Sequence, residues 1–502
     1  MKIGVSHPYF CYLHSPMQRK LDKEAKMGRF YNDTVAAIST AMSDAGIGIV
    51  RMSGPEAFLI ADRVYRGKRK KLLSEQRTHT IHYGYVMDGE CMVDEVLVML
   101  MRGPHSFTGE DTVEINCHGG VYVVKRILEL LIDRGARPAE PGEFTKRAFL
   151  NGKLDLSQAE AVGDLISSRN QYALQSSVSQ LKGNIRDKIS EIRNEIIYHT
   201  AFIESALDDP EHISVDGYGE KLRQTVEKLM GQIRNLIDTY DDGRMIKEGI
   251  RTVILGRPNA GKSSLLNVLL GEERAIVTEI AGTTRDILEE HINLRGISLN
   301  MIDTAGIRDT EDIVEKIGVD RARNYAGQAD LILYVIDASM PLDENDEEIF
   351  RLIREKKSII LLNKTDLETV VTEEEVKNAY FASNLSNLNS KEINKFTIPI
   401  ISISIREKIG IDVLEETLKV MFFEGKLSFN DEIYITNLRH KTALQDSFYA
   451  LERVKDSIDS GMPEDFYSID LLDAYESLGE ITGEKAGEDL VNEIFSKFCM
   501  GK

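Results

Sequence analysis

The chain has 502 residues with 82 Asp and Glu against 62 Lys and Arg, so its formal net charge at neutral pH is −20. This balance argues against a protein that coats nucleic acid, because phosphate neutralisation needs a positive surface. With 29% charged and 42% hydrophobic residues, four scattered cysteines and no apolar run of bilayer length, the composition excludes a disordered, a disulfide-stapled or a membrane-spanning protein and predicts a cytoplasmic protein of roughly three domains.

Residues 1–28 are interpreted as an extension, since their charged stretch lacks the apolar core and cleavage site of a signal peptide. Short β-rich runs, among them 34–39, 48–52, 79–86 and 95–100, then alternate with helical patterns at 55–65 and 120–134, which predicts an α+β domain over residues 29–148. Residues 1–150 carry 21 basic and 18 acidic side chains, so this end of the chain is slightly basic. Its cluster of six cations is interpreted as either a solvated face or a local RNA contact, and consists of Arg63, Arg66, Lys68, Arg69, Lys70 and Lys71.

Long amphipathic helices are predicted over residues 149–248. One stripe of isoleucines ends before Pro210, and a second stripe of leucines, isoleucine and valine is expected to end at Gly243. The first stripe is Ile185, Ile189, Ile192, Ile196 and Ile203, and the second is Leu222, Val226, Leu229, Ile233 and Leu236. This spacing is typical of a helical bundle.

Strands and helices alternate over residues 249–424, with apolar runs at 251–255, 297–302, 331–336, 358–362 and 398–403. Apolar runs of this length, separated by helices, predict a doubly wound parallel sheet. Helices return over residues 425–502, with one apolar face at Leu444, Phe448, Leu451, Val454 and Ile458 and another at Leu471, Leu472, Tyr475 and Leu478. We therefore expect an α/β domain inserted into a helical domain whose two halves pack together.

The α/β segment begins with the motif Gly256-Arg-Pro-Asn-Ala-Gly-Lys-Ser263, between a predicted strand and a predicted helix. Glycines at this spacing let backbone N–H groups wrap phosphates, Lys262 reaches the terminal phosphates, and the Ser263 hydroxyl ligates Mg²⁺. The order of strand, motif and helix predicts a nucleoside triphosphate site.

Two further motifs narrow the nucleotide to GTP. Asp303-Thr-Ala-Gly306 follows a strand, where an acidic residue reaches the magnesium shell and a glycine approaches the terminal phosphate. In Asn363-Lys-Thr-Asp366, the carboxylate of Asp366 can accept the two hydrogen bonds that guanine offers and adenine does not. The base-binding loop is then expected at Ser404-Ile405-Arg406, with isoleucine where alanine is usual.

The residue that positions the attacking water is not the glutamine of Ras-like GTPases, because Ile307 follows the Asp-x-x-Gly element. The nearby candidates are Arg308, Asp309, Glu311, Asp312 and Glu315. Each of them alone also fits a solvated surface charge.

These motifs, with Ala275-Ile-Val-Thr-Glu-Ile-Ala-Gly-Thr-Thr-Arg-Asp286, Phe107-Thr-Gly-Glu-Asp111, Pro141 to Leu150 and the terminal Phe498-Cys-Met-Gly-Lys502, resemble the MnmE (TrmE) family of tRNA modification GTPases. The resemblance covers residues 32–502 and departs from the family at Met500, where isoleucine is usual. It implies an N-terminal α+β folate-binding domain, a helical bundle and an inserted Ras-like G domain.

For the G domain, the resemblance implies that Glu315 orients the water and acts with Lys262 in catalysis. It further implies Mg²⁺ held by Ser263 and Thr284, and K⁺ held by Asn259, Thr278, Ile280 and Thr283. The implied GTP-binding set is Asn259, Ala260, Gly261, Lys262, Ser263, Ser264, Thr278, Glu279, Ile280, Ala281, Gly282, Thr283, Thr284, Asp303, Thr304, Ala305, Gly306, Asn363, Lys364, Asp366, Ser404, Ile405 and Arg406.

For the N-terminal domain, the resemblance implies homodimerisation and binding of 5-formyl- or methylene-tetrahydrofolate by Arg51, Glu114, Lys153 and Lys502, with Cys499 as a candidate for the modification site. It implies a heterotetramer with an FAD protein of the MnmG (GidA) type that modifies the wobble uridine of certain tRNAs. The alternative is an RNA- or ribosome-assembly GTPase switch without modification activity. Cys117-His118 lacks a second Cys/His pair at ligand spacing, so we expect no zinc there.

Overall fold

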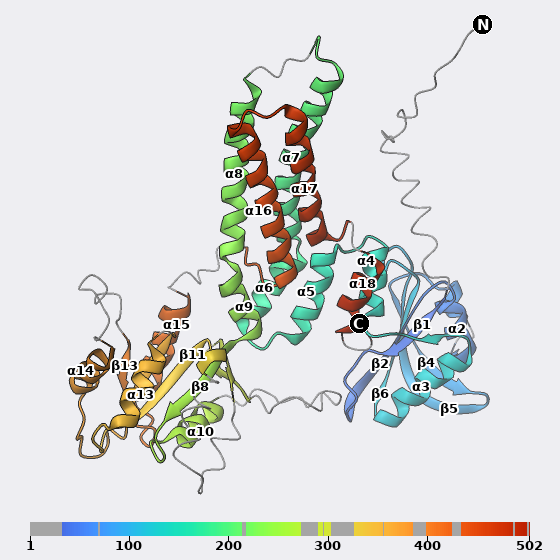
Figure 1. The fold of residues 1–502 in the computed structure, drawn as a ribbon. Coiled ribbons are helices and arrows are strands. Elements are labelled where there is room, and N and C mark those ends of the chain that lie inside the picture. The colour runs from blue at the N-terminus through green and yellow to red at the C-terminus, as the bar shows by residue number, and fades with distance from the viewer. Residues whose placement is uncertain are drawn as a thin grey trace. The chain divides into compact units, whose positions relative to one another are not determined.

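The computed structural model describes residues 33–68, 71–212, 217–272, 290–294, 296–302, 326–354, 356–384, 398–423, 433–484, 487–498 and 501. The chain divides into two compact units (Figure 1). The first comprises residues 1–163, 180–190 and 479–502, and the second comprises residues 164–179 and 191–478. Within the described ranges, none of the helices has the length and apolar character needed to cross a bilayer.

The first unit is built on a seven-stranded sheet of order β3-β4-β5-β6-β2-β1-β7, antiparallel except for the β1–β7 pair. Its strands are β1 Val35–Ile38, β2 Ala45–Ser53, β3 Tyr65–Gly67, β4 Thr80–Asp88, β5 Cys91–Met101, β6 Thr112–Gly119 and β7 Arg137–Pro138. The predicted strands and both predicted helices are confirmed, whereas β3, β6 and β7 were not predicted.

One face of this sheet forms the core with α2 (Ala57–Val64) and α3 (Val121–Asp133), and a short 3₁₀ turn, η1 (Leu73–Glu75), closes it. Alternation along the strands sends every second side chain to the other face. There Tyr83 lies opposite Leu97, and both side chains are exposed, as is Ile81. The sheet therefore has one buried face and one partly apolar outer face.

The first unit is completed by α4 (Glu143–Leu150), the start of α5 (Leu156–Ser167), and α18 (Glu488–Ser496). Leu156 and Ala159 pack with Val491 and Phe495, so the C-terminal helix shares a core with residues far earlier in the sequence. Gly142 has φ 67°, and a Cβ there would lie 2.6 Å from the carbonyl oxygen of Phe495. The glycine permits this close approach.

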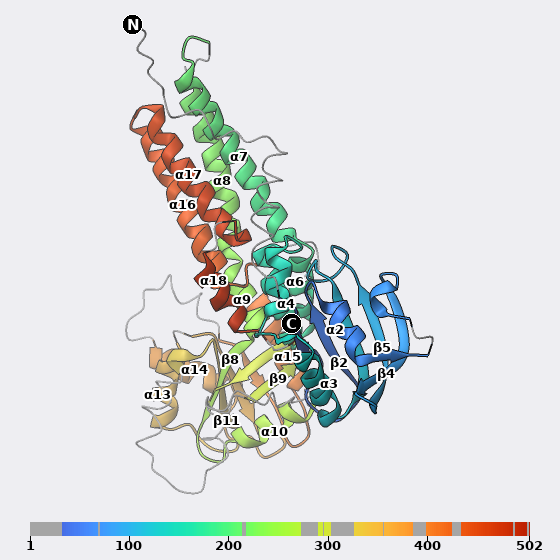
Figure 2. The ribbon, with the colours of Figure 1, turned by 90° about the vertical axis from the view of Figure 1, so that its right-hand side faces the viewer.

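The helical part of the second unit holds most of a bundle seen side-on in Figure 2. Both predicted apolar stripes are buried, which confirms them, and the first helix ends at Asp208 as Pro210 predicts. Helix α16 lies along α8, where Arg223 pairs with Asp459 at 3.0 Å and Lys455 pairs with Glu227 at 3.0 Å. The helices are α6 Gln171–Leu181, α7 Asn184–Asp208, α8 Tyr218–Asp238, α9 Tyr240–Glu248, α16 Leu438–Asp459 and α17 Glu464–Thr482. The expected packing of the two helical halves is thus confirmed.

Two details of the helical prediction are wrong. The second helix ends at Asp238 and a new one, α9, begins at Tyr240, so Gly243 lies inside a helix and does not end one. A Cβ on Gly243 would lie 2.3 Å from the carbonyl oxygen of Ile435, so this glycine serves the close approach of the returning chain. Leu472, assigned to an apolar inner face, is 38% exposed.

The α/β part of the second unit is a six-stranded sheet of order β13-β12-β11-β8-β10-β9, parallel except for the edge strand β9. Helices α10 and α15 pack on one face, and α13 and α14 on the other. The expected fold class is confirmed. Its elements are β8 Ile250–Gly256, α10 Lys262–Glu272, β9 Glu290–Leu294, β10 Ile297–Met301, β11 Leu331–Asp337, α13 Glu344–Ile353, β12 Ser358–Asn363, α14 Glu373–Asn384, β13 Ile400–Ser402 and α15 Ile411–Phe423.

Candidate functional site

The loop between β8 and α10 is held tightly against its neighbours. Gly256, Asn259 and Gly261 all have positive φ, at 153°, 60° and 105°. A Cβ would meet the Val335 carbonyl oxygen at 2.4 Å if added to Gly256, and the side-chain nitrogen of Asn363 at 2.3 Å if added to Gly261. Since α10 begins at Lys262, the loop presents the free N–H groups of a helix N-terminus, which is a site for anions.

Lys262 turns its ammonium group back over this loop. It donates hydrogen bonds to the carbonyl oxygens of Gly256 at 2.8 Å and Arg257 at 2.7 Å. Burial lowers the pKa of Lys262, because desolvation disfavours its charged form. A phosphate bound in the loop would supply a negative partner for this ammonium group.

The Arg257 side chain joins this loop to residues outside it. Its guanidinium donates to the carbonyl oxygen of Pro341 at 2.9 Å and pairs with Asp343 at 3.0 Å and with the buried Asp346. Asp343 and Asp346 also form the capping box of α13, and Tyr334 of β11 donates to Asp346. The predicted phosphate-binding loop, residues 256–263, is therefore fixed to the start of α13.

Asn363 joins the phosphate loop to the predicted base-binding loop. Its buried amide donates to the carbonyl oxygen of Ala260 at 2.8 Å and accepts a hydrogen bond from the Ile405 N–H at 3.3 Å. Lys364 follows with φ 65° and pairs with Asp337, at the end of β11, at 2.6 Å. Because β8, β11 and β12 are parallel, their carboxyl ends bring these residues to one edge of the sheet.

Asp366 lies exposed at this edge, where a base could reach it. Its carboxylate accepts a hydrogen bond from the Ser404 hydroxyl at 2.7 Å, and this bond is the main cause that lowers the pKa of Asp366. The carboxylate is thus held in the ionised form that accepts hydrogen bonds from guanine. The Arg406 side chain next to it is 79% exposed.

Ile405 replaces the usual alanine without disturbing the loop. Its side chain is 7% exposed and belongs to the apolar core that α10 and α15 share with the sheet. The added methyl groups fill that core, while the backbone N–H still bonds to Asn363.

The described residues bring Asn259, Ala260, Gly261, Lys262, Ser263, Ser264, Asn363, Lys364, Asp366, Ser404, Ile405 and Arg406 to the ends of adjacent elements of one α/β domain. The remaining nucleotide-site predictions fall outside the described residues. They are Thr278, Glu279, Ile280, Ala281, Gly282, Thr283, Thr284, Asp303, Thr304, Ala305, Gly306 and Glu315.

The predicted folate residues lie in the first unit. Arg51 of β2 and Glu114 of β6 are register partners, and the Arg51 guanidinium donates to the Glu114 carboxylate at 2.7 Å. The Lys153 ammonium is exposed and donates to the carbonyl oxygen of Pro104 at 3.1 Å. Lys502 and Cys499 lie outside the described residues, but the Ser39 hydroxyl donates to the carbonyl oxygen of Gly501 at 3.1 Å, which brings the chain end beside β1.

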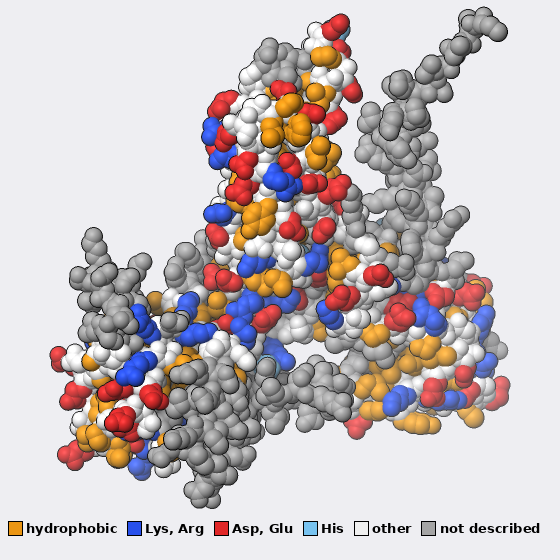
Figure 3. All heavy atoms as spheres, viewed as in Figure 1, with side chains coloured by type: hydrophobic (Ala, Val, Ile, Leu, Met, Phe, Trp, Pro, Cys, Tyr) orange, Lys and Arg blue, Asp and Glu red, His pale blue; other side chains and the backbone are white. Residues whose placement is uncertain are grey.

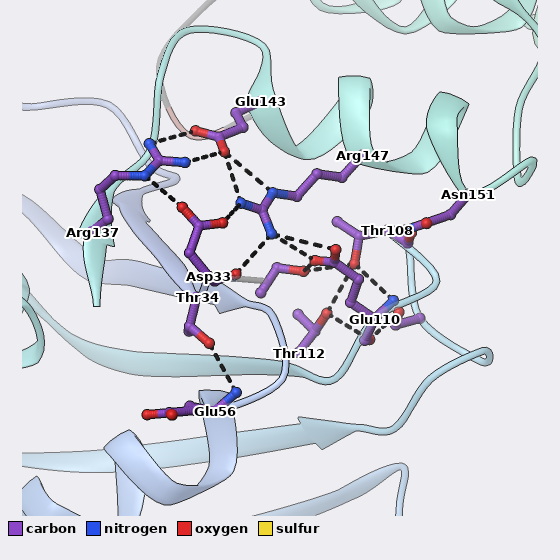
Figure 4. Close-up of polar contacts among 12 residues, drawn as sticks. Asp33, Thr34, Glu56, Thr108, Glu110, Thr112, Arg137, Glu143, Arg147 and Asn151 are labelled. Atoms are coloured by element: carbon purple, nitrogen blue, oxygen red, sulfur yellow. Dashed lines mark hydrogen bonds and ion pairs between the residues drawn. The ribbon is translucent and has the colours of Figure 1, made fainter. Parts of the chain in front are cut away.

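A buried charge network, which the sequence did not reveal, lies in the same unit (Figure 4). Arg147 is fully buried and pairs with Asp33 at 2.7 Å, Glu143 at 2.8 Å and Glu110 at 3.2 Å. Arg137 pairs with Asp33 and Glu143 from the outer side. The available signal was the Glu143–Arg147 spacing of four on a predicted helix, together with an acidic Glu110 in a motif shared with the family.

The loop that contains Glu110 reaches both sides of the predicted folate site. Glu110 accepts a hydrogen bond from Ser53, two residues after Arg51, at 2.7 Å. The carbonyl oxygen of Thr108 accepts one from Asn151, two residues before Lys153, at 2.7 Å. Arg147 thus holds the loop that contacts Ser53 and Asn151, which lie two residues from Arg51 and Lys153 in the sequence.

Cys117 and His118 have separate surroundings. Burial raises the pKa of the Cys117 thiol to about 11, and the thiol donates to the Gly48 carbonyl oxygen. His118 is exposed and bonds to Asp94, which raises the pKa of His118. Among the residues that the structure describes, no group of three or more potential metal ligands occurs.

The basic cluster is partly engaged within the first unit. Arg63 donates to the carbonyl oxygen of Arg134 at 2.5 Å, Arg66 lies 3.9 Å from Glu90, and the Lys68 ammonium lies over the Tyr83 ring at 4.7 Å. Arg69 and Lys70 fall outside the described residues. The RNA contact stays a prediction.

Comparison with known proteins covers nearly the whole chain. Residues 34–153 match the family described as GTP-binding protein TrmE N-terminus, and residues 156–499 match the MnmE helical domain. The chain is 57% identical to the tRNA modification GTPase MnmE of Lachnoclostridium phytofermentans, over 94% of this chain and 99% of that protein. Identity is 47% to the tRNA modification GTPase MnmE of Acetivibrio thermocellus and 45% to that of Staphylococcus epidermidis, each over 94% of this chain and at least 99% of the relative.

Proposed function

The chain belongs to the MnmE family of tRNA modification GTPases, and on that premise we propose that it is a potassium-dependent GTPase that works with an MnmG-type flavoprotein. Together they add an aminomethyl or carboxymethylaminomethyl group at C5 of the wobble uridine of certain tRNAs, with a carbon from a folate. The observation that carries the proposal is the convergence of Lys262, Asn363 and Asp366 on one sheet edge. We further propose domain boundaries at 29–148, 149–248, 249–424 and 425–502.

For hydrolysis, the phosphate loop binds the β- and γ-phosphates through its backbone N–H groups and Lys262, whose charge stabilises the transition state. Asp366 selects guanine. The Ser263 hydroxyl, at the start of α10, suits a magnesium ion, and the exposed Asn259 side chain beside the loop suits a potassium ion. Bound there, the two cations would neutralise charge that develops on the phosphates. Thr284 would complete the magnesium shell, Thr278, Ile280 and Thr283 the potassium shell, and Glu315 would orient the attacking water.

Potassium dependence is tested by measuring GTP turnover in KCl and in NaCl at equal ionic strength. We expect turnover to be at least about tenfold faster in KCl, since the ion supplies charge at the phosphates that an arginine supplies in other GTPases. Equal rates in the two salts would remove the potassium role.

The role of Glu315 is tested by Glu315→Ala, with Asp312→Ala as the control from the same stretch of carboxylates. We expect Glu315→Ala to reduce turnover by about 10² or more and to leave GTP affinity near that of the unmodified chain. Asp312→Ala should keep turnover. If both variants hydrolyse GTP normally, another group positions the water.

We propose that the folate binds near Arg51, Glu114 and Lys153, beside the loop that contains Glu110. A folate tail carries carboxylates that suit Lys153, Arg51 and Lys502, and the pterin edge offers donors for a carboxylate such as Glu114. Isothermal titration with 5-formyl-tetrahydrofolate should show binding that Lys153→Ala and Glu114→Gln weaken at least about tenfold, while Lys125→Ala does not. Cys499 is proposed as a residue of the modification step without an assigned role.

We propose that the chain is a homodimer through the outer face of its N-terminal sheet, where Ile81 is 61%, Leu97 47% and Tyr83 39% exposed. Apolar side chains on an otherwise solvated sheet suit a self-complementary partner. Leu97→Asp should convert the dimer to monomer in light scattering. A dimer of unchanged size would exclude this face.

The tRNA step is tested by nucleoside analysis of tRNA from cells that lack the gene. We expect the modified wobble uridine to disappear and to return when the gene is supplied. Its persistence would refute the assigned pathway even if GTP hydrolysis is confirmed.

A further inference from the structure

We propose that the flavoprotein partner docks on the second unit at an exposed surface of α7, α17 and the turn that precedes α17, called here the α7–α17 face. It consists of Ile197, Met462, Phe466, Ile469 and Leu472. This inference rests on the proposed function, since it assigns a docking surface to the partner named there.

The two helices are neighbours. The Arg193 guanidinium of α7 lies 4.0 Å from the ring centroid of Tyr475 of α17 and donates to its carbonyl oxygen at 3.2 Å. The helices run in opposite directions (Figure 1), so Ile197, one turn after Arg193, and Leu472, one turn before Tyr475, follow this contact toward the same end of the bundle. The exposed apolar residues thus come from both helices.

The apolar side chains of this face are strongly exposed to solvent. Ile469 is 61%, Phe466 49%, Met462 44% and Leu472 38% exposed, and Ile197 is 36% exposed. Their neighbours Tyr467, Leu471 and Ala474 point into the bundle and are buried. The core of the bundle is thus packed without these exposed apolar residues. We therefore interpret them as an interaction surface.

The charge around the face selects the partner. Helix α17 carries six carboxylates, Glu464, Asp465, Asp470, Asp473, Glu476 and Glu480, and no Lys or Arg. Residues 194–212 of the chain carry five more, Glu195, Glu204, Asp208, Asp209 and Glu211, again with no Lys or Arg. Asp470 and Asp473 pair with Arg453 of α16 and Glu195 pairs with Lys228 of α8, so cations of the neighbouring helices also reach this surface, where carboxylates remain in excess. Figure 3 shows orange side chains among red and some blue ones over the upper part of the bundle.

These charges exclude two occupants and favour a third. RNA would bring phosphates against carboxylates, and a second copy of the chain would bring two acidic surfaces together. A protein surface with apolar side chains at its centre and Lys and Arg around them satisfies both the apolar area and the charge. The face is therefore assigned to a basic-rimmed partner protein.

The test uses the full-length chain and the purified flavoprotein, with the dissociation constant measured by titration calorimetry. Phe466→Ser and Ile469→Ser should each weaken binding at least about tenfold, since exposed apolar anchors of this size carry much of the affinity of an interface. Val420→Ser on α15, where the side chain is 60% exposed, is the matched control and should leave affinity unchanged. Melting temperature and GTP turnover of the chain alone should not change in any of the three.

A second variant tests the charge without touching the apolar residues. The double change Glu464→Lys and Asp465→Lys should slow association and reduce its dependence on salt, whereas Glu344→Lys on α13 should not. Wild-type binding that survives all of these changes would overturn the docking surface and leave the proposed function intact. No binding by the unmodified chain would refute the flavoprotein partnership itself, and a change of oligomeric state in Phe466→Ser would assign the face to a second copy instead.

Discussion

Arg257 connects the loop between β8 and α10 to the start of α13. Its carbonyl oxygen accepts a hydrogen bond from Lys262, while its guanidinium leaves the loop for Pro341, Asp343 and Asp346. The buried partner Asp346 is fixed in turn by Tyr334 and by the capping box of α13. The side chain therefore positions the loop without lying where a phosphate would bind.

Replacing Arg257 with Ala should weaken GTP binding about tenfold, because a charge-assisted brace worth about 1.5 kcal/mol is lost from a loop that must be ordered to bind. Turnover at saturating GTP should change much less. Fluorescent-nucleotide titration and steady-state kinetics measure the two effects. Arg351→Ala is the control, because it removes an exposed guanidinium from α13, the helix whose start Arg257 contacts. Unchanged GTP affinity in Arg257→Ala would show that the brace has no positioning role.

In the first unit, Arg147 likewise holds a loop in place, and removal of its side chain should lower the free energy of unfolding. Arg147→Ala leaves Glu143, which is 2% exposed, without its buried cation and should destabilise this unit by about 3–5 kcal/mol. Arg137→Ala removes a cation that is 39% exposed from the same carboxylate and should cost about 1 kcal/mol or less. Urea unfolding followed by circular dichroism measures both. Equal losses would contradict the importance of burial.

At the scale of elements, close approaches between segments distant in the sequence decide the role of individual glycines. Gly243 lies inside α9 against the carbonyl oxygen of Ile435, at the point where the chain returns to the bundle. The N–H of Ile435 is also bonded to the Thr239 hydroxyl at 3.0 Å. A side chain at residue 243 would separate these two segments.

Gly243→Ala should therefore destabilise the second unit by about 1–3 kcal/mol through overpacking, although alanine favours helix. Gly231→Ala is the opposite case, because Gly231 lies in the middle of α8 with open space around its would-be Cβ. That change should stabilise the helix by about 0.5–1 kcal/mol. Thermal unfolding of the two variants gives the comparison, and a stabilised Gly243→Ala would contradict the close approach.

The elements predicted from the sequence are those whose pattern is local. Stripes such as Ile185 to Ile203 fix which helix face is buried, and the phosphate-loop motif fixes the junction of β8 and α10. Gly243 was misread because its partner Ile435 lies almost two hundred residues away, and Leu472 because an outward apolar residue fits a helical stripe as well as an inward one. The Arg147 network was missed for the same reason, since Asp33, Glu110 and Glu143 meet only in the folded unit.

At the scale of the whole molecule, the inserted α/β segment is tied to the helices that flank it within the second unit. Ile246 of α9 and Ala173 of α6 are buried in the same apolar core as the strands and α10. Arg244 of α9 pairs with Asp330, at the start of β11, at 3.0 Å, and Arg251 pairs with the same carboxylate at 3.0 Å. The start of β11 and α9 therefore join the α/β domain to the bundle within this unit.

The Asp330 ion pairs should make this connection sensitive to acid. Burial raises the pKa of Asp330, but the hydrogen bonds from Arg251 and Arg244 outweigh burial and lower it to about 2. An unfolded aspartate titrates near pH 4, so the ionised form stabilises the folded chain above about pH 4, and this contribution is lost as the pH falls toward 2. A shift of this size corresponds to about 2 kcal/mol.

Asp330→Asn should accordingly be less stable than the unmodified chain by up to about 2 kcal/mol at pH 7, and the difference should shrink as the pH falls below 4. Glu416→Gln, with a carboxylate that is 72% exposed, should show little difference at either pH. A deficit in Asp330→Asn that does not depend on pH would mean that packing, and not the charge of Asp330, joins the α/β domain to the bundle.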